Sequence, residues 1–105
     1  MLTDEQSTRL DELILASSWG TKVKLREADP FRIGDVVLTI TDSHFASALL
    51  VVAKPLPWGP IEFSLFRVEM LDFSFPKQLV VGPWIGFESF VHSFAAYLAS
   101  QEPGT

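Results

Sequence analysis

The spacing of apolar residues changes twice along this chain, and the changes divide it into three parts. Leu10, Leu13 and Ile14 have helical spacing near the start, whereas between residues 21 and 81 the apolar positions mostly alternate with a period of two. From Phe87 onward the spacing is helical again. Because steps of three and four are typical of helices and alternation is typical of strands, the sequence predicts a β-sheet bracketed by two helices.

Local signals support both helices. Thr3 and Gln6 have the spacing of a capping box, which favours a helix start at this point, and Gly20 marks its expected end. The last helix is expected to bury a single stripe of large apolar side chains, formed by Phe87, Phe90, Val91, Phe94 and Leu98.

Three strands are predicted in the first half of the chain, over residues 21–26, 35–41 and 45–53. The third is apolar almost without interruption, so it is expected to be covered on both sides and to lie centrally in the sheet. In the first, Val23 and Leu25 are expected to face the core, which places a basic stripe on the outer face, formed by Lys22, Lys24 and Arg26. Such a stripe protects an exposed sheet edge against aggregation.

The second half begins with a loop. Residues 55–60 include three prolines and a glycine, which exclude helix and inner strand. A strand over 61–70 follows, and its apolar parity changes between Leu65 and Phe66, which predicts a β-bulge there.

Three short structural features are predicted between this strand and the last helix. The apolar parity changes again at Leu71, Phe73 and Phe75, where a bend or a new strand is expected. Residues 78–81 are expected to form a short edge strand, and residues 82–86, which contain two glycines and a proline, a rigid turn.

These elements predict one α+β domain over residues 1–105, with the order α-β-β-β-β-(β)-α. Strands that follow one another through short turns form an antiparallel meander, here of four to five strands. The helices at the two ends most simply cover one face of this sheet. At 105 residues there is no room for a second core of useful size.

Composition excludes several classes of function. The net charge is −5, so nucleic acid would be repelled unless the eight basic residues were gathered on one face. There is no cysteine, which removes disulfides, thiolate nucleophiles and zinc–thiolate sites and favours the cytoplasm. The acidic start is unlike a signal peptide, and no apolar run is long enough to span a bilayer. No cofactor motif occurs, so none is expected.

Two histidine–carboxylate pairs are the only candidates for catalysis or metal binding. His44 lies two residues from Asp42, and His92 lies four residues from Glu88. A pair without a third ligand is more often a solvated polar pair than a metal site. With no serine elbow and no phosphate loop, the sequence favours a protein that is not an enzyme.

Aromatic residues in rigid segments give the candidate binding sites. Trp58 and Trp84 lie among prolines and glycines, where a tryptophan loses little entropy on binding, and Phe87 follows Trp84 closely. On the opposite side of the last helix lies a row of small residues that favours contact with another chain or with the same helix of a second copy, formed by Ser89, Ser93, Ala96 and Ser100.

The resulting hypothesis is a small acidic cytoplasmic protein-interaction module that binds a partner protein, and its negative charge favours a basic partner. The order of elements is similar to that of some bacterial immunity proteins and inhibitors. It is broadly similar to that of secretion chaperones, which form homodimers, although those usually carry an extra helix amid the strands. A third alternative is a small-molecule site between the sheet and the last helix, lined by Phe63, Phe66, Phe90 and Phe94.

Overall fold

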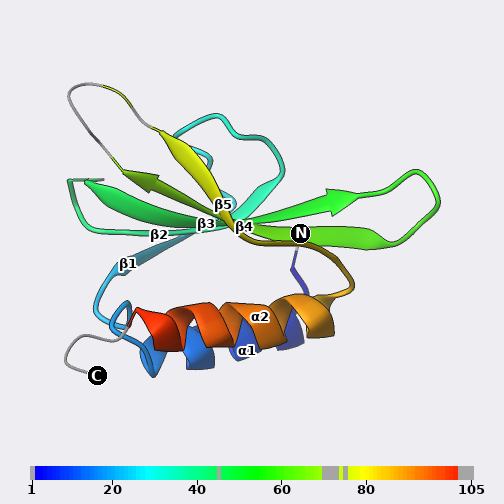
Figure 1. The fold of residues 1–105 in the computed structure, drawn as a ribbon, viewed down its shortest axis with the longest axis horizontal. Helices are drawn as coiled ribbons and strands as arrows, with labels where there is room; N and C mark the ends of the chain where they lie inside the picture. The colour runs from blue at the N-terminus through cyan, green and yellow to red at the C-terminus, as the bar shows by residue number, and fades with distance from the viewer. Residues whose placement is uncertain (1, 45, 70–73, 75, 102–105) are drawn as a thin grey trace.

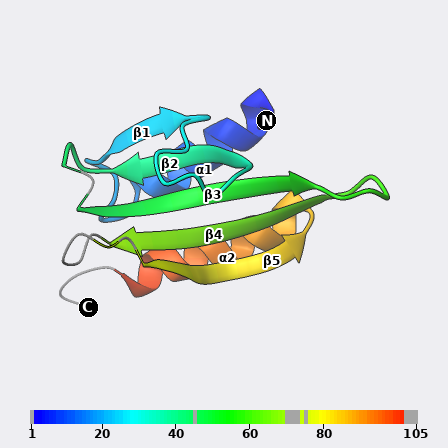
Figure 2. The ribbon, with the colours of Figure 1, turned by 90° about the horizontal axis from the view of Figure 1, so that it is seen from above.

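The computed structural model describes residues 2–44, 46–69, 74 and 76–101, and it has the predicted α+β architecture. Two helices bracket five strands, with the bounds α1 Asp4–Leu15, β1 Val23–Arg26, β2 Val36–Thr41, β3 Ser47–Pro55, β4 Ile61–Glu69, β5 Lys77–Ile85 and α2 Phe87–Ser100. The strands form one sheet in the order β1-β2-β3-β4-β5, and every neighbouring pair is antiparallel. Both helices lie side by side on one face of this meander (Figures 1 and 2).

The predicted capping box starts α1. The side chain of Thr3 accepts a hydrogen bond from the backbone N–H of Gln6, and the side chain of Gln6 accepts one from the backbone N–H of Thr3. The helix ends at Leu15, five residues before Gly20. The intervening segment turns Trp19 into the core, where it is buried.

The main core lies between the sheet and the two helices. The rings of Phe90 and Phe94 stack with their centroids 5.5 Å apart, and Phe63 of β4 lies 5.7 Å from Phe90. Buried aliphatic side chains from α1 and the three central strands complete this layer, among them Leu10, Ile14, Leu38, Ile40, Leu49, Val51 and Leu65.

The other face of the sheet is also apolar, and the loop between β1 and β2 covers part of it (Figure 1). Phe31 and Ile33 of this loop pack on a second cluster of buried residues, formed by Val36, Ala48, Leu50, Val52 and Val68. The carboxylate of Asp29 holds the loop by accepting hydrogen bonds from the backbone N–H groups of Ile33 and Gly34, at 2.8 and 2.7 Å. As expected, β3 is central and buried on both sides, with Phe45 outside the described residues.

The sheet is irregular at the expected point between Leu65 and Phe66, but the extra residue lies in β5 and not in β4. β4 pairs with β3 in unbroken register from Ile61 to Glu69, and its apolar parity changes because both faces of the sheet are buried. Phe63 and Leu65 face the helices, whereas Phe66 faces the opposite cluster. An irregularity does exist between Leu65 and Phe66, but only in the pairing with β5, where Val80 is the extra residue. The expected parity change at 71, 73 and 75 lies outside the described residues.

The turn predicted over 82–86 is wrong, because residues 82–85 continue β5. Trp84 pairs with Phe63, and the edge strand runs over 77–85 instead of 78–81. Gly82 has φ +90° and lies so close to β4 that a Cβ atom would come within 2.7 Å of the carbonyl oxygen of Phe63. Pro83, which follows a cis peptide bond, is tolerated because an edge strand need not donate on its outer side.

β1 faces the opposite way from the prediction. The side chain of Arg26 binds the carboxylate of Asp11 on α1, and the Nζ atom of Lys24 lies 4.0 Å from the same carboxylate. The basic side chains therefore face α1, and Val23 is exposed. The reason is that Asp11 provides an ionic partner on the helix side, which alternation alone does not reveal.

Arg67 links β4 to the C-terminal end of α2 and to Trp19, which lies in the segment after α1. Its guanidinium donates to the carboxylate of Glu69 at 2.9 Å and, at 3.2 Å each, to the hydroxyl of Tyr97 and the side-chain oxygen of Gln101. It also lies over the indole of Trp19, 5.7 Å from the ring centroid. The hydrogen bond to Tyr97 raises the pKa of Arg67 above its ordinary value, so the guanidinium keeps its positive charge.

Truncating a buried side chain and an exposed side chain on the helices should change the free energy of unfolding by very different amounts. Phe94→Ala should lower the free energy of unfolding by about 3–5 kcal/mol, because it leaves a cavity beside Phe90. Leu15→Ala, at a side chain that is 70% exposed, should change it by less than about 0.5 kcal/mol. Urea denaturation followed by circular dichroism measures both, and equal losses would contradict this assignment of the core.

Candidate functional site

Exposed large apolar side chains gather at one end of the molecule. In the described part of the chain there are seven of them, and four lie on the β3–β4 hairpin and the adjoining end of β5. We call these four the hairpin-end surface: Trp58 (71% exposed), Ile61 (37%), Trp84 (44%) and Ile85 (54%). Apolar groups concentrated in this way are typical of interaction sites, whereas single exposed apolar residues are ordinary.

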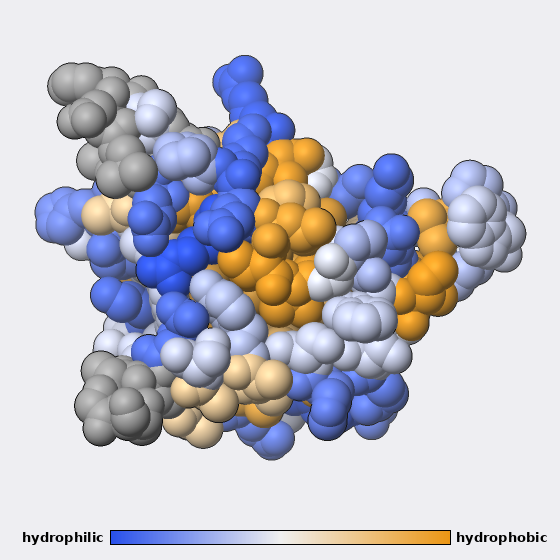
Figure 3. All heavy atoms as spheres, viewed as in Figure 1, coloured by the Kyte–Doolittle hydropathy of each residue, from blue (hydrophilic) through white to orange (hydrophobic). Residues whose placement is uncertain are grey.

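The tip of the β3–β4 hairpin presents Trp58 away from the body of the molecule. The hairpin projects well beyond the neighbouring strands (Figure 1), and hydrophobic side chains lie along it (Figure 3). The backbone N–H of Leu56 donates to the carbonyl of Pro60 at 2.9 Å, and that of Gly59 donates to the carbonyl of Leu56 at 3.0 Å. With these bonds and its prolines the tip is preorganised, so that little conformational entropy is lost when Trp58 becomes buried.

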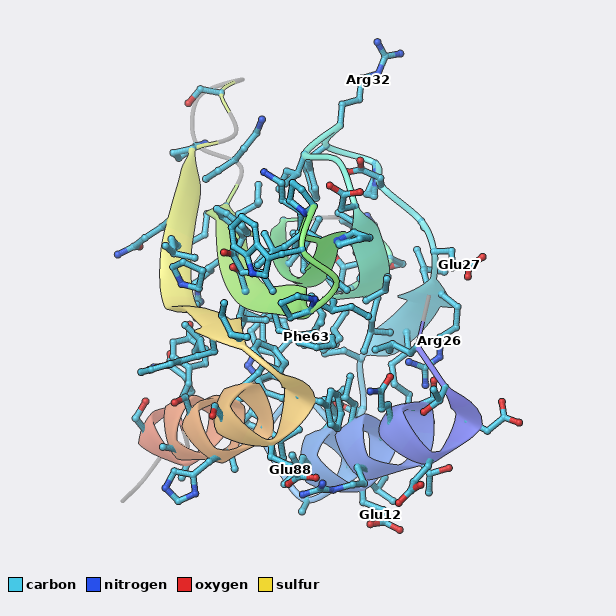
Figure 4. The ribbon with its side chains drawn as sticks, turned by 90° about the vertical axis from the view of Figure 1, so that its right-hand side faces the viewer. Glu12, Arg26, Glu27, Arg32, Phe63 and Glu88 are labelled. Atoms are coloured by element: carbon cyan, nitrogen blue, oxygen red, sulfur yellow. The ribbon has the colours of Figure 1, made fainter. Side chains whose placement is uncertain are left out.

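Trp84 forms one wall of a hollow between β5 and α2, which we call the Trp84 hollow. It has a volume of about 410 Å³, and its other lining residues come from the first two turns of α2: Glu88, Ser89, His92 and Ser93. Glu88 lies on the first turn of α2, on the side next to α1 (Figure 4), where its carboxylate forms an ion pair with Arg9. The guanidinium of Arg9 also lies over the ring of Phe87, 5.8 Å from the centroid.

The structure brings together only some of the residues that the sequence singled out. Trp84, Ser89 and Ser93 share the hollow. Ala96 is exposed farther along α2 and is not part of the hollow's lining. Phe87 is half-buried and packs edge-on against Phe63 at 5.4 Å, so it contributes to the core.

Ile61 and Ile85 complete the hairpin-end surface, and sequence reasoning missed both. Ile85 falls within the predicted turn over 82–86 and Ile61 within the predicted strand over 61–70, and neither prediction marks an exposed apolar side chain. Continuing the alternation of β5 through Pro83 would have placed Trp84 and Ile85 on opposite faces of an edge strand, where at least one of them must meet solvent.

Neither histidine forms a catalytic pair with its expected carboxylate. Asp42 accepts hydrogen bonds from the backbone N–H groups of His44 and Ala46 at 3.0 and 3.2 Å, as a turn residue does. The hydrogen bond from Ala46 lowers the pKa of Asp42 below its ordinary value. Glu88 binds Arg9. Among the described residues, no group of three or more histidines, aspartates and glutamates is arranged to hold a metal ion.

The four phenylalanines proposed to line a pocket do not lie together. Phe63, Phe90 and Phe94 are buried and pack against one another, so their rings occupy the space between the sheet and α2. Phe66 lies on the opposite face of the sheet.

Comparisons with known proteins give no match. No protein-family model matches the sequence, and neither does any curated protein or solved structure. No helix within the described ranges is long and apolar enough to cross a membrane. The class of protein is therefore defined here by its fold, an α+β domain with a five-stranded antiparallel meander and two helices on one face.

Removing an exposed aromatic side chain and removing a packed one should have different effects on the free energy of unfolding. Trp58→Ala should change the free energy of unfolding by less than about 0.5 kcal/mol, because the indole makes few contacts in the free protein. Phe87→Ala should lower it by about 2 kcal/mol, because the ring packs on Phe63. Thermal and urea unfolding measure the difference, and a large loss for Trp58→Ala would show that its indole supports the fold.

Proposed function

We propose that this protein is a non-enzymatic protein-binding module that docks a partner protein through the hairpin-end surface. The observation that carries the proposal is Trp58, exposed at the tip of a hydrogen-bonded, proline-rich hairpin. Tryptophan is among the residues that contribute most to binding when a partner buries it. Ile61, Trp84 and Ile85 are further exposed apolar side chains near the base of this hairpin, with Trp84 and Ile85 on opposite faces of β5.

Side-chain contact fits this surface better than strand addition does. β5 is an edge strand, but its register is interrupted at Val80 and again between Phe63 and Leu65, and Pro83 lacks a backbone donor. Irregularities and proline are devices by which edge strands avoid pairing with another chain. The projecting hairpin instead suits insertion into a concave surface, as an inhibitor or an immunity-type protein would do.

The net charge of the chain favours one kind of partner protein. A net charge of −5 favours association with a basic protein, because complementary charge raises the rate of encounter. The lack of cysteine is compatible with a reducing compartment, and we place the protein in the cytoplasm on that basis.

The proposal is tested by affinity capture from the native host with two matched double variants. Trp58→Ala with Trp84→Ala should lose the captured partner, because it removes both indoles of the surface. Leu15→Ala with Val23→Ala removes two exposed apolar side chains elsewhere and should retain it. Circular dichroism establishes that both variants are folded. Capture of the same protein at equal yield by both variants would overturn the proposal.

A further inference from the structure

A second hollow lies where α2 ends, at the end of the molecule opposite the hairpin-end surface (Figure 1). We call it the Arg67 pocket. It has a volume of about 280 Å³, and its lining comes from the segment after α1, the start of β3, the end of β4 and the end of α2: Ser18, Trp19, Lys22, Ser47, Arg67 and Gln101. Two of these described lining residues are basic, and none of them is acidic.

Four contacts hold the guanidinium of Arg67 at this pocket. Its Nε atom donates to Glu69 and its Nη1 atom to Tyr97 and Gln101, while the group lies over the indole of Trp19. Gln101 and Trp19 also line the pocket. No hydrogen bond between described residues uses Nη2. The N–H groups of Nη2 are therefore the donors that this arginine can offer to a ligand.

Lys22 brings a second positive charge, and among the described residues it forms no ion pair. Its backbone N–H donates to the carbonyl of Trp19 at 3.1 Å, so the lysine follows directly on the indole that Arg67 covers. The carboxylate of Asp42, near Lys22, instead accepts hydrogen bonds from backbone N–H groups of its own turn. Lys22 and Arg67 thus direct two cationic donors to one pocket.

The side chain of Ser47 points to a polar ligand independently of these charges. Its Oγ atom is buried and has no hydrogen-bond partner, alone among the buried side-chain polar atoms of the described residues. An unpaired buried hydroxyl costs free energy, and a ligand that accepts its proton removes this cost. Ser47 pairs with Glu69 and Leu49 pairs with Arg67, so the hydroxyl and the guanidinium belong to neighbouring rungs on the helix side of the sheet.

A phosphate group fits this set of donors better than a carboxylate does. Its oxygens point in tetrahedral directions, so they can accept from a guanidinium, an ammonium and a hydroxyl that come from three different segments. A carboxylate is planar and is satisfied by one arginine in the bidentate arrangement. In this pocket Nε of Arg67 is already taken by Glu69, which removes that arrangement.

We infer that the Arg67 pocket binds a phosphate group through Lys22, Arg67 and Ser47, either as free phosphate or as the monoester of a small molecule. The inference goes beyond the proposed function, because the two sites lie at opposite ends of the molecule and neither requires the other (Figure 1). Glu69 and the partial negative charge at the C-terminal end of α2 oppose an anion here, so we expect binding in the millimolar range.

The test is a titration of the full chain followed by NMR at constant ionic strength. Inorganic phosphate and glycerol phosphate are the probes, and acetate is the carboxylate control. The indole N–H signal of Trp19 and the backbone N–H signals of Lys22 and Ser47 report on the pocket. We expect saturable shifts with phosphate and none with acetate. Tighter binding of glycerol phosphate would assign the pocket to a monoester, and tighter binding of inorganic phosphate would assign it to the free anion.

Three charge variants locate the interaction. Lys22→Gln should weaken phosphate binding roughly threefold to tenfold, because it removes one ionic contact at the surface. Lys54→Gln is the matched control, since Lys54 is exposed on the hairpin and does not line the pocket, and it should leave binding unchanged. Glu69→Gln should strengthen binding about twofold to fivefold, because it removes the carboxylate that shares Arg67.

Ser47→Ala separates a binding role from a structural one. Without phosphate the variant should be as stable as the parent protein or more stable, because it removes a buried hydroxyl that has no partner. Its affinity for phosphate should nevertheless fall about twofold to fivefold, as expected for one lost hydrogen bond. Urea denaturation and the same NMR titration measure the two effects.

The inference is overturned by any of three results. Neither phosphate probe gives saturable shifts, acetate binds as tightly as phosphate, or Lys54→Gln weakens binding as much as Lys22→Gln. Circular dichroism establishes that each variant is folded. None of these results affects the capture experiment on the hairpin-end surface, so the proposed function is tested separately.

Discussion

Both faces of the central strand must be removed from water, and the rest of the structure depends on this constraint. Residues 48–53 of β3 are apolar without interruption and buried throughout. One helical layer covers only one side of such a strand. The other side is covered in part by the loop between β1 and β2, which Asp29 holds in place through two backbone hydrogen bonds. The domain therefore has two apolar clusters on the two faces of a single sheet.

The same constraint explains where sequence reasoning succeeded and where it failed. Element types, their order and the central position of β3 follow from periodicity, because each depends on residues close together in the chain. The parity of β4 was misinterpreted as a bulge, since a strand buried on both faces has apolar residues at both parities and alternation carries no information there. The orientation of β1 depends on Asp11, which packing brings next to Lys24 and Arg26 from a different element.

For a related reason, only part of the candidate site could be predicted from the sequence. Trp58 and Trp84 stand out because tryptophan among prolines is unusual in any sequence. Their surroundings depend on tertiary structure, since the hollow forms only where the end of β5 lies beside the first turns of α2. Packing against Phe63 likewise decides the role of Phe87. Its position on the last helix, close to Trp84 in sequence, is compatible with either a core side chain or an exposed binding side chain. Local chemistry thus identified the aromatic residues, and the fold decided which of them face outward.

The order of the strands also bears on how the chain folds. Each strand of the meander pairs with the strand that follows it in sequence, so the sheet assembles from local hairpins with short closed loops, which favours rapid folding. α1 differs, because its partner helix lies at the other end of the chain, as the ion pair between Arg9 and Glu88 shows. During synthesis α1 leaves the ribosome before α2, so it completes its packing only after α2 has been made. Until then its apolar stripe, with Leu10 and Ile14, lacks the surface of α2 against which it is finally enclosed.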